Sequence, residues 1–173
     1  VLQVLVRRGA RSASSELRWL AMLREPKSKI SILAIGSRGD FQPYLALQLS
    51  LQKAGHAVRM YAYENFAKQA KQYSVDFFSL KFNVEEIIRT DPAIREAMTE
   101  GDIKKYLEAN KNALPLDVLV KVWTPVIDDL ETYRPDLLIT GPSSKPMGLI
   151  ISWRMDIPGF IIDLQPTSPS AEY

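Results

Sequence analysis

The chain has 173 residues, of which 46% are hydrophobic and 24% charged, a balance that fits one globular domain or one domain with a tail. It contains no cysteine, which excludes disulfide scaffolds, zinc–thiolate sites, iron–sulfur clusters and thiol nucleophiles. Its single histidine, His56, excludes any site that needs two imidazoles. No apolar run approaches the roughly 18 residues of a membrane-spanning helix.

The formal net charge of +2 hides an uneven distribution. Residues 1–29 carry seven basic and two acidic side chains, whereas the rest of the chain carries 15 basic and 18 acidic ones. We therefore divide the chain into a basic amino-terminal arm, 1–29, and a mildly acidic domain, 30–173. Because the basic character resides in the arm, no nucleic-acid partner is expected.

The arm has two interpretations. Its Arg- and Ser-rich composition resembles an organelle transit peptide or its remnant, and it is equally typical of a linker or a surface helix that packs on the domain. Residues 1–6 are too short for a secretory apolar core. We therefore expect a cytoplasmic or organellar location rather than secretion.

The domain alternates strand and helix patterns. Short runs rich in β-branched residues predict strands at 30–35, 56–61, 75–80, 136–140 and 158–164. Helical patterns lie between them: one that begins near Pro43 and ends at Gly55, one at 64–72, a more polar helical stretch over 83–133, and one at 146–155. This alternation predicts an α/β fold, a Rossmann-like doubly wound parallel sheet of about five or more strands.

The loop after the first strand is the first place to look for a site, because ligands of such sheets bind beyond the carboxyl ends of the strands. Gly36 and Gly39 let the backbone approach a ligand, and the amides at the start of the next helix favour an anion. The glycine spacing matches neither the dinucleotide fingerprint nor the P-loop. A nicotinamide or ATP site is therefore not expected.

Asp40 is the one carboxylate of this loop, and two roles are open to it. It can accept a proton from a substrate hydroxyl, or it can cap the helix that begins near Pro43. The spacing alone favours the cap. Arg38 can pair with a phosphate, pair with Asp40 or stay solvated. The polar loop Gln165-Pro166-Thr167, which follows the last strand on the same side, can contact a ligand or simply turn the chain.

Other polar and aromatic residues are expected to be structural. His56 is at the head of the second predicted strand, at the opposite edge of the sheet from the site. Trp123 and Trp153 have spacings more typical of core residues than of a ligand platform. The pair Asp128-Asp129 lies on a helix, where consecutive residues point to different faces, so it is a poor metal site. No metal site is expected.

Several segments resemble a known family, in the order that the family has them. They are Gly36-Ser37-Arg38-Gly39-Asp40-Phe41-Gln42-Pro43-Tyr44, the stretch from Leu51 to Arg59, Glu64-Asn65-Phe66, the stretch from Tyr133 to Ile139, Asp156-Ile157-Pro158-Gly159 and Gln165-Pro166-Thr167. Together they resemble the amino-terminal domain of sterol glucosyltransferases, of antibiotic-aglycone glycosyltransferases and of glycosyltransferase family 28. The resemblance covers roughly 30–167.

The resemblance implies one half of a GT-B fold, in which two Rossmann-like domains face each other across a cleft. The amino-terminal half binds the acceptor, here a sterol or another lipid or hydrophobic hydroxyl compound. The other half binds most of the UDP-sugar donor. Transfer inverts the anomeric centre without a metal or another cofactor. Asp40 matches the family's proposed base. The loop that lines the donor phosphates or the cleft corresponds to Gly36, Ser37, Arg38 and Gly39. The acceptor side corresponds to Gln165, Pro166 and Thr167.

Two hypotheses about function follow. In the first, the chain is the acceptor-binding half of an inverting glycosyltransferase, completed by a carboxyl-terminal donor domain or a partner chain. Because donor contacts are absent up to Tyr173, we expect the chain alone to transfer no sugar. In the second, it is a non-catalytic, glycosyltransferase-like subunit of a larger assembly, which is organellar if the arm is a transit peptide. The basic arm and a lipid acceptor are both compatible with association with a membrane surface or a large complex. We expect acceptor selectivity to reside in the polar helical region 83–130.

Overall fold

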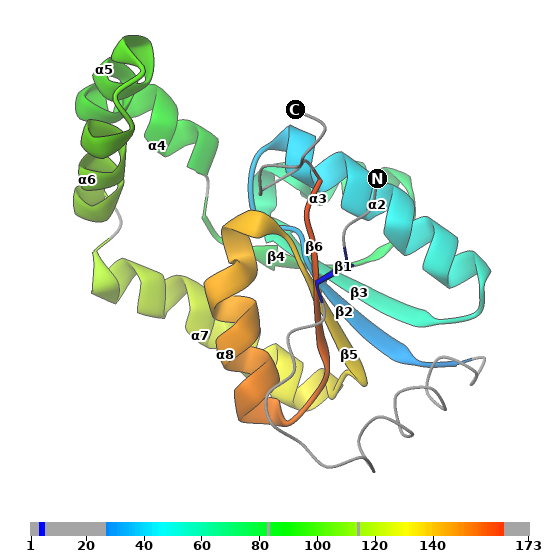
Figure 1. Cartoon of the computed structure of the whole chain (residues 1–173). Helices are drawn as coiled ribbons and strands as arrows, with labels where there is room; N and C mark the ends of the chain where they lie inside the picture. The colour runs from blue at the N-terminus through cyan, green and yellow to red at the C-terminus, as the bar shows by residue number, and fades with distance from the viewer. Residues whose placement is uncertain (1–3, 6–26, 83, 114, 165–173) are drawn as a thin grey trace, which may run out of the picture.

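The computed structural model describes residues 4–5, 27–82, 84–113 and 115–164, and places most of them in an α/β domain (Figure 1). The strands are β1 (Val4–Leu5), β2 (Lys29–Leu33), β3 (Ala57–Tyr63), β4 (Asp76–Leu80), β5 (Leu137–Thr140) and β6 (Gly159–Ile162). They form one sheet in the order β1-β6-β5-β2-β3-β4. β2 to β6 are parallel, and β1 pairs antiparallel with β6. The predicted parallel sheet of about five or more strands is confirmed.

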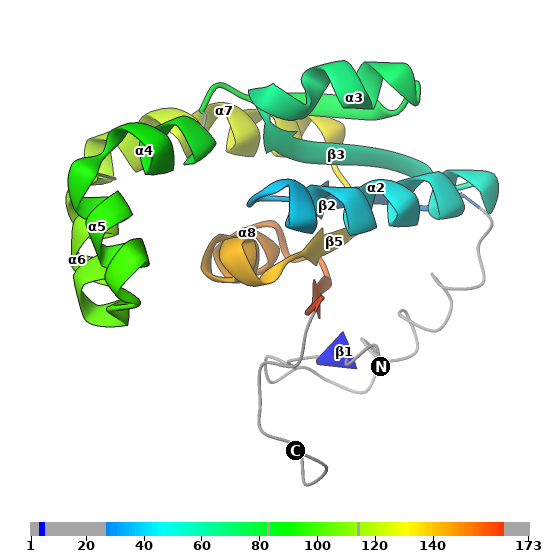
Figure 2. The same cartoon turned by 90° about the horizontal axis from the view of Figure 1, so that it is seen from above.

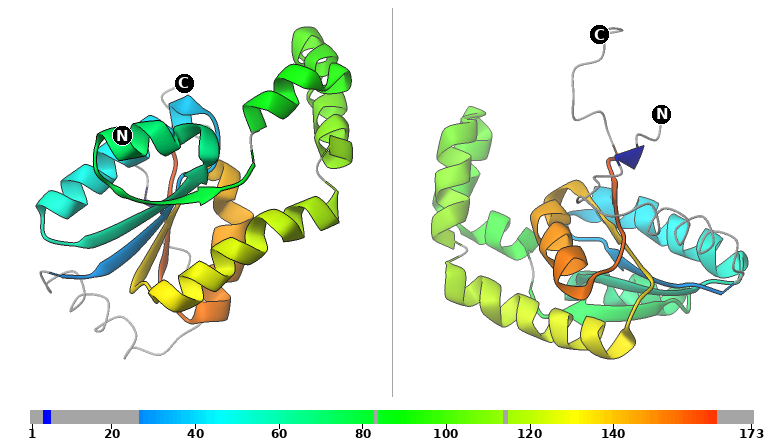
Figure 3. Two further views of the ribbon diagram at one scale, coloured as in Figure 1. Left: turned by 180° about the vertical axis from the view of Figure 1, so that it is seen from behind. Right: turned by 60° about the horizontal axis from the view of Figure 1, so that its bottom comes forward.

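The helices cover both faces of the sheet. They are α2 (Arg38–Lys53), the 3₁₀ turn η1 (Glu64–Phe66), α3 (Ala67–Gln72), α4 (Val84–Thr90), α5 (Pro92–Glu100), α6 (Ile103–Ala113), α7 (Leu116–Tyr133), the 3₁₀ turn η2 (Pro142–Ser144) and α8 (Lys145–Met155). α2 and α3 lie on one face, whereas α7 and α8 lie on the other (Figures 1 and 3). Right-handed crossovers require this division, because the chain moves outward from β2 in one direction to β4, returns to β5, and then moves outward in the other direction.

The core lies between the sheet and these helices. Along β2 every residue after Lys29 is buried, which is why the run lacks the polar alternation of a half-exposed strand. On one side Phe41 of α2 stacks on Phe66, with ring centroids 4.3 Å apart. On the other side Val126 and Leu130 of α7 are fully buried. Apolar burial therefore helps to hold both helix layers on the sheet.

Helices α4, α5 and α6 stand apart from the layers that pack on the sheet (Figures 1 and 2). Asp91 caps α5 by accepting from the amides of Ala93 and Ile94, and Gly101 ends it in the left-handed conformation. Ile94 and Ala97 are buried, so the three short helices have a small core of their own. Within the described ranges, no helix combines the length and the apolar character needed to cross a bilayer.

Three predictions need correction or lie outside the description. The first helix begins at Arg38, not near Pro43, which lies inside it. Trp153 is 81% exposed on α8, beside exposed Leu149 and Ile150, so its predicted core role is wrong; Trp123 is partly buried against the core as expected. Of the basic arm 1–29, the structure describes only 4–5 and 27–29.

Candidate functional site

The candidate site lies where β2 and β5 end side by side at the carboxyl edge of the sheet. The chain leaves β2 toward one face and β5 toward the other, so the two exits diverge at this point. Such a switch point is where doubly wound sheets bind ligands. The loop from Gly36 to Asp40 follows β2 directly and opens α2.

A capping box fixes the conformation of this loop. Ser37 is the N-cap of α2: its Oγ accepts from the amide of Gly39 at 3.2 Å. Asp40 Oδ2 in turn accepts from the Ser37 amide at 2.8 Å and from the Ser37 hydroxyl at 3.1 Å. Asp40 thus takes part in capping, as predicted, but as the third residue of the helix: Ser37 is the N-cap, and the helix starts five residues earlier than expected. Both bonds end on Oδ2, and neither uses Oδ1.

Gly36 makes this arrangement sterically feasible. Its φ is +146°, a conformation that side chains rarely adopt. A Cβ atom at this position would also overlap the Asp40 carboxylate. The glycine therefore serves the placement of Asp40 as much as the approach of a ligand.

Arg38 is exposed in the first turn of α2. The Gln42 amide oxygen accepts from its Nε at 3.1 Å and from its Nη2 at 3.2 Å. Gln42 is itself exposed, so this contact is readily exchanged for another. A cationic guanidinium at a helix amino terminus is suited to a phosphate group.

Ser144 ties the end of β5 to the end of β2. Its buried hydroxyl donates to the Leu33 carbonyl at 2.9 Å and accepts from the Gly141 amide at 3.2 Å. Thr140 Oγ1 lies 2.6 Å away. The two exits that border the site are therefore joined by a buried polar contact.

Tyr44 links the first turns of α2 to the end of β6. Its buried hydroxyl donates to the Ile162 carbonyl at 2.6 Å. Burial and the charges of Asp40 and Asp163 raise the pKa of Tyr44, so the phenol remains a donor. Sequence reasoning missed Ser144 and Tyr44, because their partners lie more than 100 positions away along the chain.

The remaining predicted site residues have different outcomes. The last residue that the structure describes is Leu164, so Gln165, Pro166 and Thr167 lie outside the described residues. His56 accepts from the Ser28 amide through Nδ1 at the opposite edge of the sheet, which agrees with the structural role expected for it. No group of three or more metal-ligating side chains occurs in the part of the chain that the structure describes.

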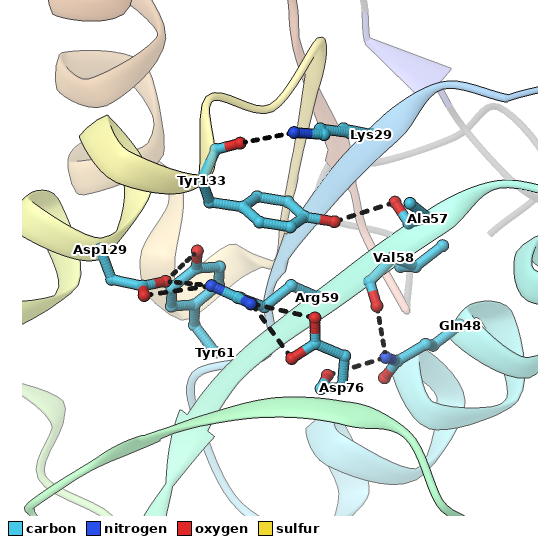
Figure 4. Close-up of polar contacts among 9 residues, drawn as sticks. All are labelled: Lys29, Gln48, Ala57, Val58, Arg59, Tyr61, Asp76, Asp129 and Tyr133. Carbon is cyan, nitrogen blue, oxygen red and sulfur yellow. Dashed lines mark hydrogen bonds and ion pairs between the residues drawn. The ribbon is translucent and has the colours of Figure 1, made fainter.

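A second polar cluster lies away from the site, between α7 and strands β3 and β4 (Figure 4). Arg59 Nε donates to both carboxylate oxygens of Asp76, at 3.1 and 3.0 Å. Its Nη1 donates to both carboxylate oxygens of Asp129, also at 3.1 and 3.0 Å. Tyr61 donates to Asp129 at 2.8 Å, and the Arg59 guanidinium lies 4.3 Å from the centre of the Tyr133 ring. Asp129 faces this cluster whereas Asp128 is exposed, as expected for consecutive helical residues. The cluster is fully paired and attaches α7 to the sheet.

Replacing Ser37 with alanine should lower the free energy of unfolding by about 1 kcal/mol, because the Gly39 amide loses its acceptor. Urea unfolding followed by circular dichroism measures this change. Ser50→Ala serves as the control, because the Ser50 hydroxyl donates within the same helix to the Ala46 carbonyl. An equal loss from both replacements would contradict a special role of the cap.

Comparisons with known proteins agree with this geometry. The family described as the glycosyltransferase family 28 N-terminal domain matches residues 30–129. Sterol 3-beta-glucosyltransferase UGT80B1 of Arabidopsis thaliana is 29% identical over 154 residues, which cover 86% of this chain and 24% of that protein. Sterol 3-beta-glucosyltransferase of Pichia angusta is 30% identical over 148 residues, which cover 84% of this chain and 11% of the relative. The chain thus spans about a tenth to a quarter of the length of these relatives.

Solved structures show the same fold. The calicheamicin glycosyltransferase CalG4 superposes with a TM-score of 0.60 at 17% identity, over 86% of this chain and 35% of CalG4. The glycosyltransferase SsfS6 of Streptomyces sp. SF2575, complexed with thymidine diphosphate, has a TM-score of 0.60 at 21% identity, over 82% of this chain and 40% of SsfS6. The fold is therefore one half of a GT-B glycosyltransferase. The chain belongs to the glycosyltransferase family 28 N-terminal domain family and is homologous to the sterol glucosyltransferases.

Proposed function

We propose that this chain is the acceptor-binding half of an inverting glycosyltransferase that moves a sugar from a UDP-sugar to the hydroxyl of a sterol or another hydrophobic acceptor. The observation that carries the proposal is the position of Asp40, which is held in the first turn of α2 at the switch point of the sheet. The sterol acceptor is suggested by the names of the curated relatives.

In the proposed reaction Asp40 acts as the general base. Its Oδ2 is occupied by the capping bonds, so Oδ1 is the atom that faces the acceptor hydroxyl. The proton passes to Asp40 as the acceptor oxygen forms a bond to the anomeric carbon. The bond between that carbon and the UDP oxygen breaks, and UDP leaves with the electron pair. The configuration at the anomeric carbon is inverted.

The loop and the helical region supply binding. Arg38 and the positive end of the α2 helix dipole are suited to the donor diphosphate. Helices α4 to α6, which stand apart from the layers on the sheet, are the proposed source of acceptor selectivity, together with α7 up to Leu130 (Figure 2). Most donor contacts are proposed to come from a second domain or a partner chain, so the 173-residue chain alone should transfer no sugar.

Asp40→Asn provides the test. The experiment joins this chain to the donor-binding part of the Pichia angusta relative and measures transfer of labelled glucose from UDP-glucose to a sterol. The asparagine can still accept from the Ser37 amide but cannot take up a proton, so kcat should fall by roughly 10²–10⁴-fold at an unchanged KM for the sterol.

Asp136→Asn is the matched control, because Asp136 also accepts from a backbone amide, that of Lys29, but lies at the opposite edge of the sheet. It should leave transfer unchanged. If the joined enzyme turns over and Asp40→Asn has no more effect than Asp136→Asn, Asp40 is not the base. If no arrangement of this chain with a donor domain transfers sugar, the alternative of a non-catalytic subunit is favoured.

A further inference from the structure

Tyr44 joins two segments at the carboxyl edge of the sheet that are 118 positions apart in the chain. Its side chain is 1% exposed, and its hydroxyl donates to the Ile162 carbonyl at 2.6 Å. Ile162 is the last residue of β6. The bond therefore connects the beginning of α2 to the point where the chain leaves β6.

Gly141, the residue that follows β5, packs closely against the same hydroxyl. A Cβ atom on Gly141 would lie 2.8 Å from the Tyr44 hydroxyl and 3.1 Å from Cε2. Only a residue without a side chain fits against the ring at these distances. The segments that follow β2, β5 and β6 thus meet at one phenol.

Tyr44 also lies where it can fix the position of the helical turn that carries Asp40. The two residues are four positions apart on α2, so they lie on the same face of the helix in adjacent turns. Burial and the charges of Asp40 and Asp163 raise the pKa of Tyr44, so the phenol stays protonated and donates. A bond that holds Tyr44 to β6 therefore also holds the turn that carries Asp40.

We infer that Tyr44 is a positioning residue that couples the Asp40 turn of α2 to the segment leaving β6. The inference rests on the proposed function, because that function gives Asp40 the role of the base. Without the bond, the Asp40 turn and the end of β6 could move independently. Catalysis depends on this geometry, because small displacements of the reacting groups slow transfer.

Tyr44→Phe tests the coupling while it leaves the aromatic ring in the core. Hydrogen exchange of the 173-residue chain should become about fivefold faster in the segments 37–41 and 163–164, as expected for the loss of one buried hydrogen bond. Tyr133→Phe is the matched control, because Tyr133 also donates to a backbone carbonyl, that of Ala57, at the opposite edge. It should leave exchange in both segments unchanged.

Gly141→Ala tests the same hydroxyl without altering Tyr44. The added methyl group should displace the ring and accelerate exchange in the same two segments. If both variants keep wild-type exchange there, or if only one of the two segments responds to Tyr44→Phe, the inference is wrong.

Kinetics of the joined enzyme separate this inference from the proposed function. Tyr44→Phe should lower kcat about fivefold and leave KM for UDP-glucose unchanged, whereas Tyr133→Phe should change neither. Wild-type kcat in Tyr44→Phe would overturn the positioning role even if the variant melts at a lower temperature. If the wild-type joined enzyme transfers no sugar, the proposed function fails, and the exchange data alone decide whether Tyr44 couples the two segments.

Discussion

Replacing Arg59 with alanine is expected to lower the free energy of unfolding by about 3 kcal/mol, because it leaves two carboxylates without their common partner. The side chains of Arg59 and Asp129 are 25% and 21% exposed, so both charges are largely removed from water. The replacement also removes the guanidinium from the Tyr133 ring. Urea unfolding at neutral pH, followed by circular dichroism, measures the loss.

Two further variants make the Arg59 result specific. Arg59→Lys keeps the charge but cannot reach both carboxylates with a planar fork, so its stability should fall between those of the wild type and Arg59→Ala. Lys105→Ala breaks an exposed ion pair with Glu100 and should leave the urea midpoint nearly unchanged. Equal midpoints for Arg59→Ala and Lys105→Ala would refute the claim that the cluster attaches α7 to the sheet.

The free energy of unfolding should fall at alkaline pH, because the buried tyrosines ionise more readily in the unfolded chain. Burial and the charge of Asp40 raise the pKa of Tyr63 to about 12, and burial also raises the pKa values of Tyr44 and Tyr61. In the unfolded chain a tyrosine ionises near pH 10. Above that pH the folded state binds more protons than the unfolded state, so the free energy of unfolding falls as pH rises.

The stabilisation is fully present below about pH 10 and is lost progressively above it. For Tyr63 the loss continues until the pH passes about 12, at a limiting slope of about 1.4 kcal/mol per pH unit. Urea midpoints between about pH 8 and about pH 11.5 measure how steeply the free energy of unfolding falls with pH. Tyr63→Phe should make this fall less steep, because one fewer proton is released on unfolding. A Tyr63→Phe slope equal to that of the wild type would contradict the raised pKa.

The strands could be predicted from the sequence because their pattern is local. The run from Ile30 to Ile35 has no polar alternation apart from Ser31, and the strand ends within two residues of its predicted boundary. The start of α2 was misplaced for a local reason as well. A proline near the start of a helical pattern favours a first-turn position for Pro43, whereas the capping box of Ser37 and Asp40 begins the helix earlier. A proline at the sixth position lacks the amide that would bond to the Gly39 carbonyl, and its ring crowds that carbonyl, yet the helix continues to Lys53.

The parts that sequence could not predict depend on distant partners. The polar character of Tyr44, Arg59 and Ser144 is visible in the sequence, but their partners Ile162, Asp129 and Leu33 lie far along the chain. The exposure of Trp153 was missed because α8 buries Gly148 and Ile151 instead, so a small residue occupies the core face and a large one the outer face. The role of Gln165 to Thr167 in acceptor binding stays a prediction.

The pairing of β2 with β5 also determines the order in which the domain can assemble. β2, β3 and β4 follow one another in the chain and can pair after short loop closures. Pairing with β5 instead joins residues as distant as Lys29 and Asp136, which are 107 positions apart and bonded at 2.8 Å. The contacts of Ser144 and Tyr44 both span this seam. We therefore expect the β2–β4 half to form first during folding and the Asp40 turn to acquire its final surroundings last, when β5 and β6 dock.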